Sequence, residues 1–261
     1  MTPAPDLLIT NGIVMTMDAD NRIIANGSVA VCGDTITAID AAAEDGPAIG
    51  GQVIDADGGI IMPGLVNTHT HAAMTLFRGL ADDLPLMEWL NDHIFPAEAL
   101  LDPDKVHTGT LLGCTEMILS GTTCFCDMYL FTASVAQAAK TAGLRAVVGE
   151  VLYDFPSPSY GPITAGFAYT RRLIETWRDD PLVSIAVEPH SPYLCAPALL
   201  TEAADMAREN GIRMVTHLSE TRQEVDRIQA AYQATPVQHL ANLGLLGKHL
   251  LACHCVVLSQ P

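Results

Sequence analysis

Two histidines stand one residue apart in GLVNTHTHAAMTLFRGL, residues 64–80, directly after an apolar run. In a strand, residues i and i+2 share a face, so His69 and His71 would lie on one side, roughly 6 to 7 Å apart along the chain. Two imidazoles at that spacing can bind one metal ion. Two hydrogen-bonded histidines at a strand end would explain the same spacing.

A third imidazole and a carboxylate follow in THLSET. His217 would end another strand, and three strand-end nitrogens facing one point form a zinc ligand set that leaves a position open for water. Glu220 starts the loop into the next helix, where a carboxylate could reach over the metal and shuttle protons. The alternative for Glu220 is an acid in the first turn of a helix, which complements the helix dipole.

His254 lies between Cys253 and Cys255 in an apolar run. On its own, such a histidine is more often a hydrogen-bonded core side chain, because an unpaired imidazole there is costly. The seven cysteines are scattered and odd in number, which is not a disulfide framework. We interpret them as packed core thiols rather than as a thiolate zinc site.

The elements that must position these residues are strand-like apolar runs separated by helical patterns, from about residue 60 onward. The runs are GIIMPGLVNTH, TTCFCDMYL, RAVVGEVLY, VSIAVEPH, RMVTHLS and LLACHC. Helices are predicted near residues 84–101, 103–120, 132–143, 164–179, 197–210 and 221–244. This repeated alternation of strand and helix predicts a parallel α/β domain.

Two parallel architectures compete. A doubly wound sheet would place a glycine-rich phosphate turn after its first strand, but the turn here is THTHAAMT. In a (β/α)8 TIM-like barrel, polar residues at strand carboxyl ends converge on one mouth. The histidines at such ends are His69, His71, His190, His217 and His254. We therefore predict the barrel, over residues 61–261.

A complete barrel needs about 250 residues, roughly 31 per unit. Six units precede Pro261, so we expect a barrel truncated after about six strands, with the last two absent.

Residues 6–58 carry short alternating runs broken by turn pairs, which predict a small antiparallel sheet. We assign residues 1–60 to the N-terminal part of a small β-sandwich domain.

Composition argues against several classes of protein. The 30 acids and 13 bases give a net charge of −17, which repels phosphate backbones and anionic lipid. No apolar run approaches the roughly 18 residues of a spanning helix, and the N-terminus lacks the features of a signal peptide. We expect a cytoplasmic protein with a small-molecule substrate and with neither nucleic acid nor membrane as a partner.

Four stretches together resemble the amidohydrolase superfamily, and within it the methylthioadenosine/S-adenosylhomocysteine deaminase group, with triazine hydrolases as relatives by motif. They are PGLVNTHTHAAMTLFRGLADDLPLMEWL, EPHSPYLC, THLSET and CHCVVLS. The resemblance covers essentially the whole chain. It implies hydrolytic deamination of an adenine nucleoside (5′-methylthioadenosine, S-adenosylhomocysteine or adenosine) to the inosine analogue, with release of ammonia.

The resemblance also implies a role for each residue of the centre. His69, His71 and His217 would bind one divalent ion, with zinc as the expected metal. Glu220 would be the proton shuttle, and His254 would stand beside the attacking water. The family's site also uses an aspartate at the end of the eighth strand, which would lie beyond residue 261. Formation of a homo-oligomer is an expectation from the family alone.

Two residues match the family's substrate contacts. Glu98 matches the position that holds the ribose hydroxyls, and His190 matches the one that contacts the purine. Without the resemblance, we would interpret Glu98 as a solvated helix acid and His190 as a strand-end cap. Phe95 stands where the family often has tryptophan. Residues 153–170 contain no arginine, which favours methylthioadenosine or adenosine over S-adenosylhomocysteine, since relatives use arginine there for the amino-acid carboxylate.

Two alternatives stay open. The chain could belong to a hydrolase of triazines or of other aminated or halogenated heterocycles. It could also be an inactive truncated fragment, because the expected aspartate and the last strands are absent. A substrate panel separates the first alternative from the deaminase, and an activity assay on the 261-residue chain tests the second.

Overall fold

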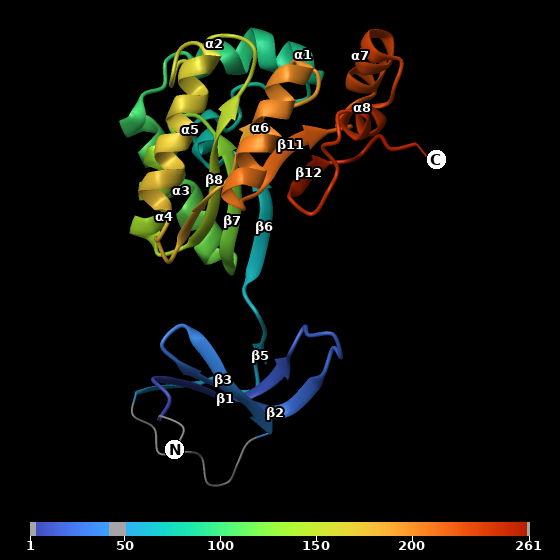
Figure 1. The fold of residues 1–261 in the computed structure, drawn as a ribbon. Helices are drawn as coiled ribbons and strands as arrows, with labels where there is room; N and C mark the ends of the chain where they lie inside the picture. Colours follow the sequence, from blue (N-terminus) through green and yellow to red (C-terminus); the bar gives the residue numbers. More distant parts are fainter. Residues whose placement is uncertain (1–3, 42–50, 260–261) are drawn as a thin grey trace. The chain divides into compact units, whose positions relative to one another are not determined.

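A computed structural model describes residues 4–41 and 51–259 (Figure 1). The chain divides into two compact units, Met1–Gly64 and Leu65–Pro261. Within the described ranges, no helix has the length and apolar character needed to cross a membrane.

The first unit is built on one sheet in the order β3-β2-β1-β4, with β5 also paired to β1. Its strands are β1 (Leu7–Met15), β2 (Ile23–Cys32), β3 (Thr35–Ala41), β4 (Gln52–Asp55) and β5 (Ile60–Ile61). The antiparallel prediction is confirmed for β1, β2 and β3. It is wrong for β4, which pairs in parallel with β1. β5, which lies beyond the residues of that prediction, also pairs in parallel with β1. The described residues of this unit form a single sheet, so the sandwich stays a prediction.

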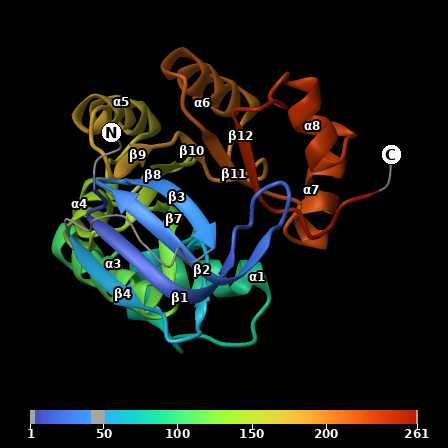
Figure 2. The ribbon, with the colours of Figure 1, turned by 90° about the horizontal axis from the view of Figure 1, so that it is seen from below.

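The second unit is a curled parallel sheet whose strands follow one another in sequence order. Figure 2 shows them along an arc with helices outside. The strands are β6 (Leu65–Thr70), β7 (Thr122–Tyr129), β8 (Arg145–Leu152), β9 (Val183–Ile185), β10 (Glu188–Pro189), β11 (Met214–Leu218) and β12 (Leu250–His254). A bridge from Val187 to Met214 joins the β6–β10 part to the β11–β12 part. This half-barrel agrees with the predicted parallel α/β architecture.

The apolar run GIIMPGLVNTH was predicted to form one strand, and this prediction is wrong. Ile60 and Ile61 pair with β1 in the first unit, and β6 begins only at Leu65 in the second. Pro63 and Gly64 lie between them, and proline cannot donate a hydrogen bond to a strand ladder. The run therefore spans the boundary between the two units.

The helices agree closely with the periodicity, with two exceptions. The α-helices are α1 (Leu86–Glu88), α2 (Phe95–Glu98), α3 (Pro103–Leu119), α4 (Thr132–Ala142), α5 (Ile163–Trp177), α6 (Pro197–Asn210), α7 (Arg222–Tyr232) and α8 (Pro236–Asn242). One exception is the helix predicted at 84–101, where a π-helix, Trp89–Ile94, lies between two short α-helices. The helix expected at 221–244 is two helices, because Gln233 adopts a left-handed conformation and Pro236 starts α8. Thr235 caps α8 in a capping box with Gln238.

The core of the second unit lies between the helices and the strands β7, β8 and β11, which we call the inner strands. Every residue of β11 is buried, as are the last five residues of both β7 and β8. The near-continuous apolar runs are therefore explained by burial on both faces. All strands point their carboxyl ends the same way, so the residues that follow them meet at one rim.

Candidate active site

His69 and His71 come from the end of β6. His69 is within the strand, and His71 directly precedes a short 3-10 helix, Ala72–Phe77. Their ring centroids are 4.9 Å apart. The two imidazoles therefore face a common space, as the H-x-H spacing indicated.

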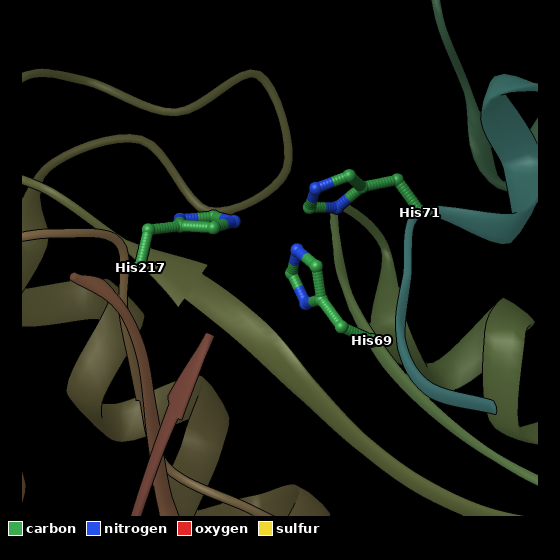
Figure 3. Close-up of side chains that lie close together, drawn as sticks. All are labelled: His69, His71 and His217. Carbon is green, nitrogen blue, oxygen red and sulfur yellow. The ribbon is translucent and has the colours of Figure 1, made fainter. Parts of the chain in front are cut away.

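His217, near the end of β11, completes a three-histidine cluster. Its ring centroid is 4.9 Å from that of His69 and 5.4 Å from that of His71, and Figure 3 shows the three rings turned toward one another. One nitrogen from each ring lies within 4.8 Å of the others. In the part of the chain that the structure describes, this is the one group of three or more histidine, cysteine or acidic residues with such spacing.

The hydrogen bonds of the cluster fix which ring nitrogens are free. His71 Nδ1 lies 2.5 Å from the carbonyl of Met128, and His217 Nδ1 lies 2.7 Å from the carbonyl of His190. A carbonyl can only accept, so each Nδ1 carries the proton and each Nε2 keeps a free lone pair. Both nitrogens of His69 are buried without a partner. A metal ion would satisfy one of them, so the cluster fits a metal.

The protonation state also suits a metal. Burial lowers the pKa of His69 to about 4 and lowers the pKa of His71. Burial also holds the pKa of His217 well below its usual value. All three rings are therefore neutral near pH 7, which is the form that binds metal ions.

Glu220 and His254 lie beside this cluster. Glu220 follows Ser219, which turns the chain with a φ of 51°, and Glu220 Oε1 is 3.6 Å from His254 Nε2. The His254 ring stacks on that of His217, with centroids 5.2 Å apart. Burial raises the pKa of Glu220. The His254 side chain is 27% exposed, so the interpretation as a core histidine is wrong.

Glu98 and His190 reach the same place from two other elements. Glu98 ends α2, and burial raises its pKa to about 7, so it is not a solvated helix acid. His190 follows β10, and its ring centroid is 4.5 Å from that of His217. Burial lowers the pKa of His190 to about 3. Its Nδ1 is 2.9 Å from Ser191 Oγ, which leaves Nε2 for another partner.

All seven candidate residues line one cavity of about 260 Å³. Most of its other lining side chains are apolar or aromatic, and they include Met74, Leu86, Trp89, Leu90, Phe95, Tyr129, Tyr153 and Tyr193. Within the described residues, no lysine or arginine lines it. A largely apolar cavity with a few convergent polar groups is typical of a small-molecule site.

Sequence reasoning missed the residues that support this cluster. Asp127, fully buried on β7, accepts a 2.5 Å hydrogen bond from the N–H of Ala72, next to His71. Glu224, on the first turn of α7, accepts from the N–H groups of Ser219 and Glu220. Asp127 interrupts an apolar strand and Glu224 follows Thr221 at capping-box spacing, so both left a signal in the sequence.

Known proteins resemble this chain in both sequence and structure. The family model described as "Amidohydrolase family" matches residues 60–261. A 5-methylthioadenosine/S-adenosylhomocysteine deaminase of Syntrophobacter fumaroxidans is 56% identical over 258 residues, which cover 98% of this chain and 58% of the relative. The chain thus spans little more than half the length of that relative.

Two solved structures resemble this chain. An adenosine deaminase from Xanthomonas campestris with bound zinc matches with a TM-score of 0.93 and 39% identity, covering 98% of this chain and 59% of the other. A triazine hydrolase from an Arthrobacter species, Arthrobacter aurescens, matches with a TM-score of 0.89 and 21% identity, covering 97% and 61%. The second likeness shows the fold alone.

Proposed function

Since this chain belongs to the amidohydrolase family, we propose that it carries most of the active site of a metal-dependent deaminase of adenine nucleosides. The reaction replaces the amino group at C6 of the purine with oxygen from water and releases ammonia. The observation that supports this most is the cluster of three neutral histidines beside an acid, on the wall of an apolar cavity.

His69, His71 and His217 would hold one divalent ion, and zinc is the metal we propose. Zinc prefers neutral imidazole ligands, and a catalytic site keeps one position open. When bound, the ion supplies a Lewis acid that lowers the pKa of water and so provides a nucleophile near neutral pH. The zinc in the similar Xanthomonas structure supports this choice.

Glu220 would manage the protons. It would take the proton of the attacking water and give it to the ring nitrogen, and a pKa raised by burial suits an acid and base that works near neutrality. His254, 3.6 Å from Glu220, would hold the attacking water in line with C6. The second proton of the water would pass to the amino group, which leaves as ammonia while C6 keeps the oxygen as a carbonyl.

Glu98 and His190 would hold the nucleoside. An ionised Glu98 can accept hydrogen bonds from two ribose hydroxyls, and the neutral ring of His190 can bond the purine through Nε2. The absence of lysine and arginine from the described cavity wall supports an uncharged 5′ group. We therefore place methylthioadenosine and adenosine ahead of S-adenosylhomocysteine as substrates.

For the architecture, we propose that residues 61–261 form six of the eight strands of a (β/α)8 barrel. Here β9 and β10, which both pair with β8, together make one strand of the barrel. Residues 1–60 would be part of a small β-sandwich domain. The sequence-ordered parallel strands and the length of the relatives support this. We keep a cytoplasmic location and a homo-oligomer as parts of the same proposal.

The test is the ultraviolet absorbance of zinc-loaded protein mixed with methylthioadenosine, since adenine and hypoxanthine absorb differently. It is run on the 261-residue chain and on a chain continued to the length of the relatives. We expect conversion in the longer chain and at least a thousandfold loss in its His217→Ala variant. Conversion that persists in His217→Ala would contradict the metal assignment. If a triazine is converted and nucleosides are not, the proposed substrate is wrong. If the longer chain is active and the 261-residue chain is not, the 261-residue chain is an inactive fragment.

A further inference from the structure

Glu224 is a buried acid outside the residues assigned above. Only 3% of its surface is exposed, although it stands in the first turn of α7. Its two oxygens accept separate backbone hydrogen bonds, Oε1 from the N–H of Ser219 at 2.9 Å and Oε2 from the N–H of Glu220 at 2.8 Å. A buried carboxylate is costly without such compensation. Here both oxygens accept hydrogen bonds from the same turn of the chain.

That turn is the one that aims Glu220. Ser219 has a φ of 51°, a left-handed conformation that residues with a Cβ adopt only at a cost. The turn is held from a second side, because the Ser219 carbonyl accepts a 2.8 Å hydrogen bond from the N–H of Val257. After it, Glu220 comes within 3.6 Å of His254.

Ordinary helix capping does not account for these contacts. Thr221 already caps α7 by accepting a 3.2 Å hydrogen bond from the N–H of Glu224. In a capping box, the acid at this position would bond the N–H of the capping residue itself. Glu224 instead reaches past Thr221 to the two residues before it.

We propose that Glu224 is a positioning residue, whose carboxylate holds the Ser219–Glu220 turn so that the Glu220 side chain stands at the metal centre. This inference rests on the proposed function for the role of Glu220. The turn itself is a property of the chain alone. Catalytic groups must be held closely, since a misplacement of about 1 Å can cost about a hundredfold in rate.

The test compares Glu224→Gln with two matched controls. Glutamine keeps the size of the side chain but offers one acceptor, so its amide N–H₂ must face one of the two backbone N–H groups. Asp226→Asn removes the same charge from an exposed position on the same helix. Thr221→Ala removes the other hydrogen bond of the same helix turn.

The first readout is amide hydrogen exchange in the 261-residue chain. We expect exchange at Ser219 and Glu220 to speed up at least tenfold in Glu224→Gln, with β8 unchanged and Asp226→Asn like the unsubstituted chain. Unchanged exchange at these two amides would overturn the proposal, and so would equal acceleration throughout the chain.

The second readout is turnover of methylthioadenosine by the zinc-loaded chain. In Glu224→Gln we expect kcat to fall at least tenfold with KM changed by less than twofold. A kcat equal to that of the unsubstituted chain, or an equal fall in Thr221→Ala, would overturn the positioning role. If the unsubstituted chain shows no turnover, that result counts against the activity of this chain, and hydrogen exchange alone decides whether Glu224 holds the turn.

Discussion

The inner and outer strands of the curled sheet differ in burial, yet the site draws on both. All five residues of β11 are buried. In β6, by contrast, Leu65 is 50% exposed and Val66 is 61% exposed. His217 comes from the buried strand, whereas His69 and His71 come from the exposed one. The site therefore combines one strand of the buried core with one strand that lies outside it.

The difference has a consequence for how the site is fixed. His217 stands on a strand bonded on both sides, through Val187 and through β12. His71 stands at the end of a strand that pairs only with β7 in the described residues. Its position depends instead on the carbonyl of Met128 and on Asp127, which both belong to β7. A buried neighbour thus supplies the rigidity that the outer strand lacks.

Truncations on β7 and on β6 should differ most in their effect on stability. Phe125 is fully buried on β7, so Phe125→Ala should lower the free energy of unfolding by about 3 to 5 kcal/mol. Val66→Ala, on the exposed strand, should change it by less than about 0.5 kcal/mol. Urea unfolding of both variants measures this. Equal losses would show that β6 is part of the folding core after all.

A smaller effect on stability should come from a buried acid on β8. Burial raises the pKa of Glu150, on the inner strand β8, from 4.5 to about 7. The folded state therefore binds this proton more tightly than the unfolded state. The contribution of Glu150 to stability is thus fully present below about pH 4.5 and is lost as pH rises through about 7. Glu150→Gln keeps an acceptor for the N–H of Thr132 and should be more stable than the unsubstituted chain at pH 8.

The measurement is the urea midpoint of both proteins at pH 5 and pH 8. The gain from Glu150→Gln should be much smaller at pH 5, where the folded side chain is mostly protonated. A gain of equal size at both pH values would mean that titration of Glu150 does not cause it.

The sequence predicted the inner part of the molecule better than its junctions. The strands β7, β8 and β11 agree with their apolar runs within one or two residues, because burial on both faces leaves a continuous signal. The same signal joined β5 to β6, since exposed apolar residues at a unit boundary look like a buried strand. Pro236 could have indicated the break between α7 and α8, but the helical periodicity continues on both sides of it, so one helix was predicted.

The site shows the same division. Strand-end histidines could be predicted because parallel strands bring their carboxyl ends together. The contacts of Asp127 and Glu224 could not, because a hydrogen bond from a side chain to a particular backbone N–H depends on the exact course of a loop. The histidine cluster therefore came from the sequence pattern, whereas the contacts that support it came only from the structure.

Zinc titration calorimetry tests most directly the claim that an inner and an outer strand build one metal site. It would be run on the 261-residue chain and on its His69→Ala and His217→Ala variants, with Asp226→Asn as a control. We predict one zinc per chain for the unsubstituted protein and the control, and at least a hundredfold weaker binding in both histidine variants. One zinc bound with undiminished affinity in either histidine variant would contradict the shared site.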